Sequence, residues 1–564
     1  MSAELQSLAR AGWLRRVDAA LGEWIARAFP DSTAAVALAA ALAGRAVGDG
    51  HSALRLDAAQ AWLAGLDARG EPPMLPDPTA WHESLAASAA VGGVVDAEAD
   101  GSPPPGPLVL DAQGRVYLAR YFGYEQRLAE SLIARARAER LKLVTGGPGT
   151  GKTHGVVRTL AALAGEAHAQ SRTARIALAA PTGKAAARLA ESVRAQLPDL
   201  ALPDTVATMI PRDASTLHRL LGLSPAGAPA KFHRDAPLPF DVVVVDEVSM
   251  VDLAMMHKLT DAVREDAMLI LLGDPGQLAA VEAGDVLGAL VDAAREPPLS
   301  KCHTHLTESR RFAAHGALGR LANAITTGDA GAALEACDHG GDVQLRAADA
   351  PGTQLLEHAT EAYREVMDAP DAAAALRSAN RFRVLTALRR GPSGSVALGN
   401  AIEHRLKRHA GVRADASWWQ GRLLMVTVNR AGVGLFNGDI GVVWPDADGE
   451  PKVWFEAADN SARALSPAAL PPHESAFALT VHKAQGSEFE HVALVTGPDS
   501  AVLTRELLYT GVTRARVGLT VHSDRDTLRT GIARRTLRMT GLADRLREAA
   551  NAPTSIADSL RVAP

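Results

Sequence analysis

The sequence predicts an α/β protein with two domains built on parallel sheets, preceded by a helical N-terminal domain. Short apolar runs separated by helical stretches occur in two sets, at residues 141–272 and 383–522. Runs of this kind are typical of strands that are buried on both faces of a parallel sheet. The first 90 residues show helical spacing instead, and residues 420–472 contain short β-rich segments. We therefore expect three domains and one β insertion.

Length, charge and cysteine content narrow the class of protein. The chain has 564 residues, 47% of them hydrophobic and 22% charged, which places it among globular proteins. Its formal net charge of −5 excludes a protein that coats nucleic acid through bulk positive charge. The two cysteines, Cys302 and Cys337, exclude a disulfide framework and predict a reducing compartment such as the cytoplasm. No window reaches the ~18 to 20 apolar residues that a membrane span requires.

The N-terminal domain is expected at residues 1–105. Apolar residues from Leu5 to Phe29 follow helical spacing, which predicts an amphipathic opening helix. Residues 96–107 combine acidic residues with a proline run that continues neither a helix nor a central strand, so we expect a linker there. This part of the chain carries no chemical motif. We expect it either to dock on a partner chain or to pack against the next domain.

The first α/β domain is expected at residues 106–345 and the second at 346–564. In the first, a hairpin is predicted at 108–118, and strands are predicted at 141–145, 176–180, 242–245 and 268–272. In the second, strands are predicted at 383–387, 476–479, 492–495 and 519–522. The insertion at about 420–472 has turn signals at Asn437-Gly438 and Asp448-Gly449, which predict a small antiparallel barrel.

A glycine-rich segment between a predicted strand and a predicted helix indicates a phosphate site. Its sequence, GGPGTGKT, has the full spacing of a phosphate-binding loop. Glycines let successive backbone N–H groups point at phosphates, Lys152 adds charge beside the β and γ phosphates, and Thr153 offers an oxygen to Mg²⁺. A tight turn without a ligand is the alternative. The predicted nucleotide-binding residues of this loop are Gly146, Gly147, Pro148, Gly149, Thr150, Gly151, Lys152 and Thr153.

Acidic and amide side chains after two further strands complete the predicted nucleotide site. Asp246 is expected to hold Mg²⁺ together with Thr153, and Glu247 is placed to polarise the attacking water as a general base. A helix-capping role is the alternative for this acidic pair. After the next strand, Asp274 and Gln277 lie at a sheet edge where the Gln277 amide is expected to sense the γ phosphate.

Two arginines far along the chain are candidates to stabilise negative charge on the γ phosphate. Arg311 and Arg514 are assigned this arginine-finger role, although each, taken alone, is more often a surface or salt-bridged residue. Arg514 belongs to the second α/β domain, so its reach toward a nucleotide on the first would link hydrolysis to domain movement. Cys302, His303 and His305 have no complementary cluster, so no zinc site is predicted.

The complete set of motifs resembles the superfamily 1 DNA helicases, and within them the RecD family. The segments occur in helicase order and span about 370 residues, whereas the first 100 residues contribute almost nothing. The matching segments are GGPGTGKT at 146, APTGKAAARL at 180, ASTLHRLLG at 214, VVVVDEVSMVDL at 242, GDPGQLAAVEAGDVLG at 273, LTESRRF at 306, LFNGDIG at 435, LTVHKAQGSEF at 479 and TRELLYTGVTRAR at 504.

The resemblance implies roles for further residues. It places Gly486 and Glu488 toward ATP, and Gln126 where such helicases often keep a glutamine that reads adenine. The pattern around Gln126 departs from the usual Asn-x-x-Gln form, which leaves the preference for ATP over other nucleotides open. A solvated helix residue and a satisfied strand-end histidine are the alternatives for Lys184 and His482. The implied contacts with the backbone of single-stranded DNA are Thr182, Lys184, Thr216, His218, Thr480 and His482.

The resemblance also implies a fold and an activity. The α/β domains would be RecA-like motor domains that bind ATP and Mg²⁺ between them, and the insertion would be SH3-like. The chain would move 5′ to 3′ on single-stranded DNA as a subunit of the RecBCD complex, exodeoxyribonuclease V, beside RecB-like helicase-nuclease and RecC-like chains. That complex acts in double-strand break repair by homologous recombination. A stand-alone RecD-type helicase and a regulatory ATP-binding subunit without translocation are the alternatives.

Overall fold

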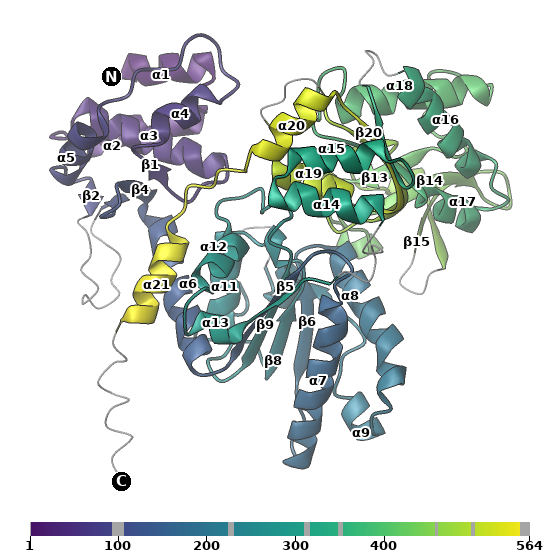
Figure 1. Ribbon diagram of the computed structural model, residues 1–564, viewed down its shortest axis with the longest axis horizontal. Coiled ribbons are helices and arrows are strands. Elements are labelled where there is room, and N and C mark those ends of the chain that lie inside the picture. Colours follow the sequence, from purple (N-terminus) through teal and green to yellow (C-terminus); the bar gives the residue numbers. More distant parts are fainter. Residues whose placement is uncertain are drawn as a thin grey trace.

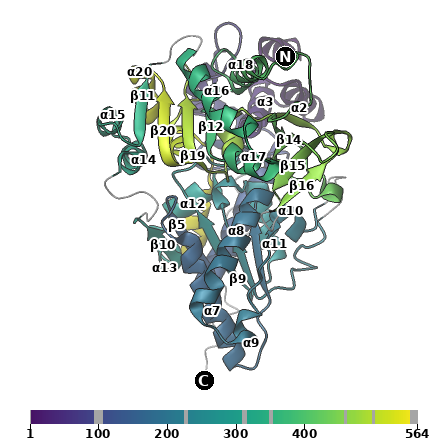
Figure 2. The same cartoon turned by 90° about the vertical axis from the view of Figure 1, so that its right-hand side faces the viewer.

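The computed structural model describes residues 2–92, 106–223, 230–308, 316–347, 353–456, 461–497 and 502–552. A helical N-terminal domain and two α/β domains lie side by side (Figures 1 and 2). The parallel-sheet fold class predicted from the sequence is therefore confirmed. Most of the predicted linker at 96–107 lies outside the described residues.

The N-terminal domain packs its helices around a long buried helix. Helix α3 is rich in alanine and lacks a polar face, so it is buried along most of its length. The indole N–H of the buried Trp81 donates to the Ala35 carbonyl oxygen at 2.9 Å and fixes α5 against α3. The helices of this domain are α1 (Ser2–Ala11), α2 (Arg16–Ala28), α3 (Ala34–Gly48), α4 (Ala59–Ala64) and α5 (Pro78–Ala86).

A small sheet joins the N-terminal domain to the hairpin at 108–118. Its order is β1-β4-β3-β2, so the two hairpin strands lie between strands from the N-terminal region. The sheet therefore contains residues from both sides of the boundary at 105 expected from the sequence. Its strands are β1 (Leu54–Arg55), β2 (Val91–Gly92), β3 (Leu108–Leu110) and β4 (Arg115–Leu118).

The first α/β domain is a six-stranded parallel sheet, ordered β10-β5-β9-β8-β6-β7, with helices on both faces (Figure 1). Alternate valines of β8 face opposite sides, because successive side chains of a strand point in opposite directions. Val243 packs with α6, α11 and α12, whereas Val244 packs with α7 and α8. The strands are β5 (Leu141–Gly146), β6 (Ile176–Ala180), β7 (Ser215–Thr216), β8 (Val242–Val245), β9 (Met268–Gly273) and β10 (His303–Leu306). The helices are α6 (Ala119–Arg137), α7 (Lys152–Ala169), α8 (Gly183–Gln196), α9 (Asp204–Ala207), α10 (Leu217–Leu220), α11 (Leu253–Ala262), α12 (Val286–Ala293) and α13 (Leu299–Cys302).

The second α/β domain repeats this plan with a five-stranded parallel sheet, ordered β11-β20-β19-β12-β18. Helices α14 and α15 lie on one side of the sheet and α16 and α17 on the other (Figure 2). Because α14 and α15 pack into the core of this domain, its elements begin before residue 346. The strands are β11 (Val343–Arg346), β12 (Phe382–Thr386), β18 (Ala478–Thr480), β19 (Phe489–Val495) and β20 (Ala515–His522). The helices are α14 (Ala317–Thr327), α15 (Ala330–Asp338), α16 (Thr353–Met367), α17 (Ala372–Ala379), α18 (Ser395–His409), α19 (Arg505–Val512) and α20 (Arg525–Ala533).

The insertion forms a five-stranded antiparallel sheet, ordered β16-β15-β14-β13-β17. Positive φ angles of 94° at Gly438 and 83° at Gly449 fit the predicted turns. In the described part of the insertion, no pairing joins β16 to β17, so the sheet is open along that side. The barrel and its SH3-like character stay predictions. The strands are β13 (Leu423–Val426), β14 (Ile440–Pro445), β15 (Pro451–Glu456), β16 (Ala462–Leu465) and β17 (His473–Ser475).

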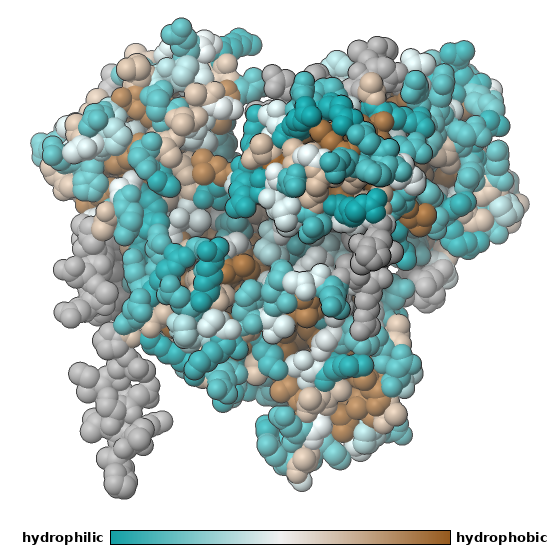
Figure 3. Space-filling view, in the orientation of Figure 1, coloured by the Kyte–Doolittle hydropathy of each residue, from teal (hydrophilic) through white to brown (hydrophobic). Residues whose placement is uncertain are grey.

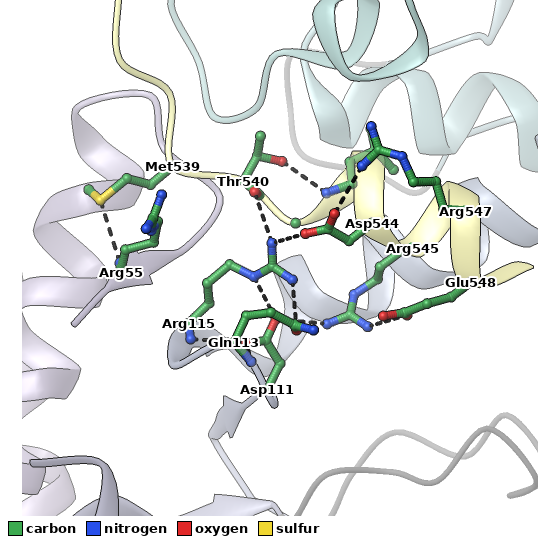
Figure 4. A network of polar contacts seen from close by, with 12 residues as sticks. Arg55, Asp111, Gln113, Arg115, Met539, Thr540, Asp544, Arg545, Arg547 and Glu548 are labelled. Atoms are coloured by element: carbon green, nitrogen blue, oxygen red, sulfur yellow. Dashed lines mark hydrogen bonds and ion pairs between the residues drawn. The ribbon is translucent and has the colours of Figure 1, made fainter. Parts of the chain in front are cut away.

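The C-terminal strap, residues 534–551, links all three domains. It leaves the second α/β domain after α20, passes the N-terminal domain and ends in α21 (Leu542–Asn551), which packs against α6 and α12 (Figure 1). The Met539 carbonyl oxygen accepts a hydrogen bond from the Ser52 N–H at 3.0 Å. The buried Arg115 of β4 donates to Asp544 of α21 at 2.6 Å (Figure 4).

On the face seen in Figure 3, hydrophobic residues lie in patches that are separated by hydrophilic residues. Hydrophilic residues cover most of the face seen in Figure 3. Trp24 and Met74 of the N-terminal domain are among the large apolar side chains that remain exposed, at 46% and 91%. In the part of the chain that the structure describes, no helix has the length and apolar character needed to cross a membrane.

Candidate active site

The phosphate loop lies between β5 and α7, where the motif predicts it. Positive φ angles of 75° at Gly149 and 83° at Gly151 turn the backbone in a way that side chains with a Cβ rarely allow. Helix α7 begins at Lys152, so its free N–H groups and positive dipole end face the loop. The Lys152 Nζ donates to the carbonyl oxygens of Gly146 and Gly147, the latter at 2.9 Å. Pro148, Thr150 and Thr153 complete the loop and the first helical turn.

Asp246 and Glu247 lie directly after β8. Glu247 has a φ of 54°, which is rare for a residue with a Cβ, and its N–H donates to the Asp246 carboxylate at 2.8 Å. Burial, and then the charge of Glu247, raise the pKa of Asp246. Backbone strain and a close pair of like charges are typical of functional sites. The oxygens of Thr153 and Asp246 are donors that fit Mg²⁺, whose charge would offset the repulsion between the two carboxylates.

Gln277 follows β9 and connects the two α/β domains. Its Nε2 donates to Asp274 at 3.0 Å, and its Oε1 accepts from the Arg514 Nη2 at 3.1 Å. Arg514 belongs to the second α/β domain and is 2% exposed. The arginine predicted to reach across the two domains therefore contacts a residue of the first domain.

The contact between the two α/β domains, which we call the seam, contains further hydrogen bonds. The Leu278 N–H donates to the Thr510 hydroxyl at 2.9 Å, and the Gln485 Nε2 donates to the Leu278 carbonyl oxygen at 3.1 Å. The seam residues of the first domain follow β9, and those of the second belong to the segments that precede β19 and β20. The seam thus brings together motifs that lie more than 200 residues apart in the sequence.

Tyr509 is a seam residue that was not among the predicted site residues. Its hydroxyl donates to Asp274 at 3.1 Å and lies 2.9 Å from the position that a Cβ on Gly147 would occupy. Its sequence signal is its place in the segment TRELLYTGVTRAR, within α19 and five positions before Arg514.

Three of the predicted DNA contacts lie at one edge of the first sheet. Thr182 follows β6 and Thr216 ends the neighbouring strand β7, and the register of these strands pairs Ala180 with Thr216. Each threonine hydroxyl caps the next helix by accepting from the N–H three residues later, at 3.2 and 3.3 Å. His218 follows in α10 with an exposed side chain. The strand pairing therefore brings Thr182 and Thr216 to the same edge of the sheet, and their contact with DNA stays a prediction.

The corresponding residues of the second domain lie near α8. Thr480 ends β18 with a buried side chain, and His482 is exposed. A Cβ on Gly486 would lie 3.6 Å from the Thr182 hydroxyl oxygen. Glu488 forms an ion pair with Arg188 of α8 at 3.5 Å. Gly486 and Glu488, expected to lie toward ATP, thus contact the helix that carries the first predicted DNA contacts.

Lys184 lies in the first turn of α8, where the first domain, the second domain and the insertion meet. Its Nζ is 5.9 Å from the centroid of the Phe489 ring. Burial, and then the charges of Arg188 and Arg383, lower the pKa of Lys184 to about 7, although Asp439 opposes this shift. A half-buried lysine with few compensating carboxylates is suited to bind an external anion such as a DNA phosphate.

The remaining predicted residues have separate outcomes. Gln126 is half-buried on α6, and its amide donates to Glu130 of the same helix at 3.3 Å. Arg311 lies outside the described residues. The Cys302 thiol lies 3.7 Å from two backbone carbonyl oxygens. A ring nitrogen of His303 and one of His305 each lie 2.8 Å from the Thr145 hydroxyl oxygen, just before the phosphate loop. Across the described residues, no group of three or more His, Cys, Asp or Glu side chains is placed to hold a metal ion.

The arrangement as a whole supports nucleotide chemistry at the boundary between two domains. One domain supplies a phosphate loop and a half-buried carboxylate pair, and the other supplies a buried arginine. Such a site can bind a nucleoside triphosphate and stabilise the charge that develops during hydrolysis. Because the components come from two domains, opening or closing of the seam changes the site.

Three family models match the chain. The model of an AAA domain matches residues 129–283, which include the phosphate loop and the acidic pair. The model of a UvrD-like helicase C-terminal domain matches residues 475–521, which include Arg514. The model of the N-terminal domain of RecBCD enzyme subunit RecD matches residues 10–117. This last match covers the N-terminal domain together with the hairpin that pairs with it.

Curated relatives are similar over most of the chain. The RecBCD enzyme subunit RecD of Mycolicibacterium smegmatis is 39% identical, with 92% of this chain and 94% of that protein covered. The same subunit of Haemophilus influenzae is 36% identical, with 76% and 74% covered. The ATP-dependent RecD2 DNA helicase of Deinococcus radiodurans is 33% identical, with 68% of this chain and 47% of that protein covered.

Proposed function

Since the chain belongs to the family of RecBCD enzyme subunit RecD and is an ATP-dependent DNA helicase, we propose that it moves 5′ to 3′ along single-stranded DNA. We further propose that it works in the cytoplasm as one subunit of a RecBCD-type complex with RecB-like and RecC-like partners. Its role there would be double-strand break repair by homologous recombination. The observation that carries the motor part of this proposal is the hydrogen bond between Arg514 and Gln277 across the seam.

The chemistry follows from the residues around the phosphate loop. The loop N–H groups and Lys152 bind the phosphates of ATP, and Glu247 orients and deprotonates the attacking water. Thr153 and Asp246 would hold Mg²⁺, which supplies positive charge at the phosphate oxygens when bound. Gln277 and Arg514 stabilise the γ phosphate from the two sides of the seam. Loss of that phosphate weakens the link between the domains and allows them to separate.

The motor grips DNA through backbone contacts on both domains. Thr182, Lys184, Thr216 and His218 would bind phosphates on the first domain, and Thr480 and His482 on the second. Because such contacts do not read bases, binding is independent of sequence and weakens as salt rises. Alternate closure and opening of the seam moves one set of contacts relative to the other along the strand.

Replacement of Lys152 by Gln tests the site. The lysine is half-buried in the loop and outside the hydrophobic core, so the variant should fold, bind single-stranded DNA like the wild type and lose DNA-stimulated ATP hydrolysis. Lys258→Gln, at an exposed position of α11, is the matched control and should keep wild-type turnover. Unchanged turnover in the Lys152→Gln protein would overturn the assignment of the phosphate site.

Two other functions remain testable. A stand-alone RecD-type helicase would unwind 5′-tailed duplexes as a single purified chain. The higher identity with a RecD subunit, 39% against 33% with a RecD2 helicase, favours the subunit instead. A regulatory ATP-binding subunit has no need of the general base Glu247. Measurement of ATP turnover with and without single-stranded DNA separates this function from a motor. A pull-down of the tagged chain from its own cell, followed by identification of its partners, separates the subunit from the stand-alone helicase.

A further inference from the structure

Tyr509 brings a hydroxyl group from the second α/β domain onto two elements of the first. The hydroxyl donates to Asp274 at 3.1 Å. It lies 2.9 Å from the place of a Cβ on Gly147 in the phosphate loop, and the Tyr509 ring carbon Cε1 lies 3.1 Å from the place of a Cβ on Gly276. Both glycines therefore leave space that the tyrosine fills, and its ring is enclosed by the loop and the turn after β9.

The Tyr509 hydroxyl belongs to a continuous series of hydrogen bonds. Burial, and then the Asp274 carboxylate, raise the pKa of Tyr509, so the group stays protonated and donates. Asp274 accepts from both Tyr509 and the Gln277 Nε2, and its second oxygen accepts from the Gly276 N–H at 3.0 Å. Because the Gln277 nitrogen is bound to Asp274, its oxygen is the atom that faces Arg514.

Two contacts of this series cross the seam and depend on its closure: that of Tyr509 with Asp274 and that of Gln277 with Arg514. Arg514 also donates to Thr510, Thr513 and Ser487, which all belong to its own domain. Among the residues that the structure describes, Gln277 is the residue of the first domain to which Arg514 donates. The orientation of the Gln277 amide therefore decides whether the arginine is met by an acceptor or by a competing N–H group.

We propose that Tyr509 is a positioning residue for ATP hydrolysis: when the seam is closed, it holds Asp274 so that the Gln277 oxygen faces Arg514 beside the phosphate loop. The proposal rests on the proposed function, because it concerns the same nucleotide site. Tyr509 touches the loop from the second domain, so it couples closure of the seam to the geometry of the γ-phosphate side chains. The competing explanation is that the Tyr509 ring only packs against the phosphate loop and the turn after β9, and that its hydroxyl has no role in hydrolysis.

Tyr509→Phe separates the two explanations, because it keeps the ring and removes the hydroxyl. In the full chain with oligo(dT), a hydrogen bond from a neutral donor to a buried carboxylate predicts a fall in kcat for ATP of roughly 10-fold. The KM for ATP should stay within about 2-fold, since the hydroxyl acts on the γ-phosphate side chains rather than on uniform binding. Tyr363→Phe is the matched control. The buried Tyr363 hydroxyl donates to the Phe477 carbonyl oxygen at 2.5 Å, in the core of the second domain.

A double-mutant cycle tests whether Tyr509 acts through Asp274. In an Asp274→Asn background, adding Tyr509→Phe should lower kcat by less than about 2-fold, because the shared route is already lost. Equal kcat values for Tyr509→Phe and Tyr363→Phe would overturn the proposal. A double variant whose fall in kcat equals the product of the falls in Tyr509→Phe and Asp274→Asn would also overturn it. A wild-type chain without DNA-stimulated turnover would instead overturn the proposed function, and the role of Tyr509 with it.

Discussion

Lys184→Met should stabilise the chain against unfolding while it weakens the binding of single-stranded DNA. Lys184 lies at the meeting point of both α/β domains and the insertion, and burial lowers its pKa from the ordinary 10.5 to about 7. A folded-state pKa below the unfolded one means that the unfolded chain binds more protons between these two values. The penalty for burying the charge is therefore complete below pH 7 and disappears as the pH rises toward 10.5.

The size of the stabilisation follows from the pKa difference. A shift of this size sets an upper bound of about 5 kcal/mol at pH 7 or below. Since the side chain keeps some contact with solvent, we expect about 2 kcal/mol in the free energy of unfolding. Methionine has a similar length and can occupy the same space beside the Phe489 ring without a charge. Denaturant unfolding at pH 7 and pH 10 should show a gain for the variant that is larger at pH 7.

The same substitution removes one phosphate contact. Plots of log affinity for oligo(dT) against log salt should have a slope that is smaller by about 0.7, the value for one neutralised phosphate on a single strand. Fluorescence anisotropy at pH 6.5 over a range of salt concentrations measures this slope. Lys258→Met, at an exposed position of α11, should change neither quantity. A Lys184→Met protein that is less stable than the wild type, or one with an unchanged salt slope, would refute this reasoning.

Three further predictions concern the N-terminal domain and the strap. Burial, and then the charge of Arg538, lower the pKa of His51 to about 4, and the His51 ring accepts a hydrogen bond from the Met539 N–H at 3.0 Å. The free energy of unfolding should fall by about 2 kcal/mol from pH 7 to pH 5, because His51 binds a proton in the unfolded chain before it does so in the folded one. Denaturant midpoints of the wild type and of His51→Asn measure this, and only the wild type should show the loss. Arg545→Met should cost about 3 kcal/mol and expose residues 534–541 to protease, since it leaves the buried Glu125 without its ion pair and removes one of the two ion pairs of Asp111. Trp24→Glu combined with Met74→Glu should abolish co-purification with partner chains without a change in melting temperature, whereas Val517→Glu, on the second domain, should keep the complex intact.

The central strands were predictable because burial leaves a local record in the sequence. The strands at 176–180 and 242–245 have the predicted bounds, since both are apolar runs with polar residues or turns on either side. Edge strands leave no such record. β10 reads HTHL and β7 has two residues, so neither contains an apolar run, although β7 carries Thr216. The prediction of a strand at 476–479 was displaced, because the chain passes directly from β17 of the insertion into β18.

The phosphate loop and its acidic partners were predictable for a different reason, which is that their chemistry fixes residue types at a fixed spacing. Tyr509 lies in a recognised segment, but its role could not be predicted, because it depends on a contact with Asp274, 235 residues away. The contact between Gln277 and Arg514 was expected only as a general approach of two domains. Its partners and its amide orientation depend on side chains that three-dimensional packing brings together.

The strap shows why the domain boundaries were hard to predict from the sequence. Glu125 of α6 is fully buried and accepts hydrogen bonds from Ser52 at 2.6 Å and Thr540 at 2.7 Å, so one carboxylate joins three regions of the chain. A buried charge without its partners costs several kcal/mol. The N-terminal domain, the first α/β domain and the strap must therefore fold against one another rather than as separate units. Because α21 is fixed to the first domain and α20 to the second, residues 534–541 must absorb any movement between these domains during the ATP cycle.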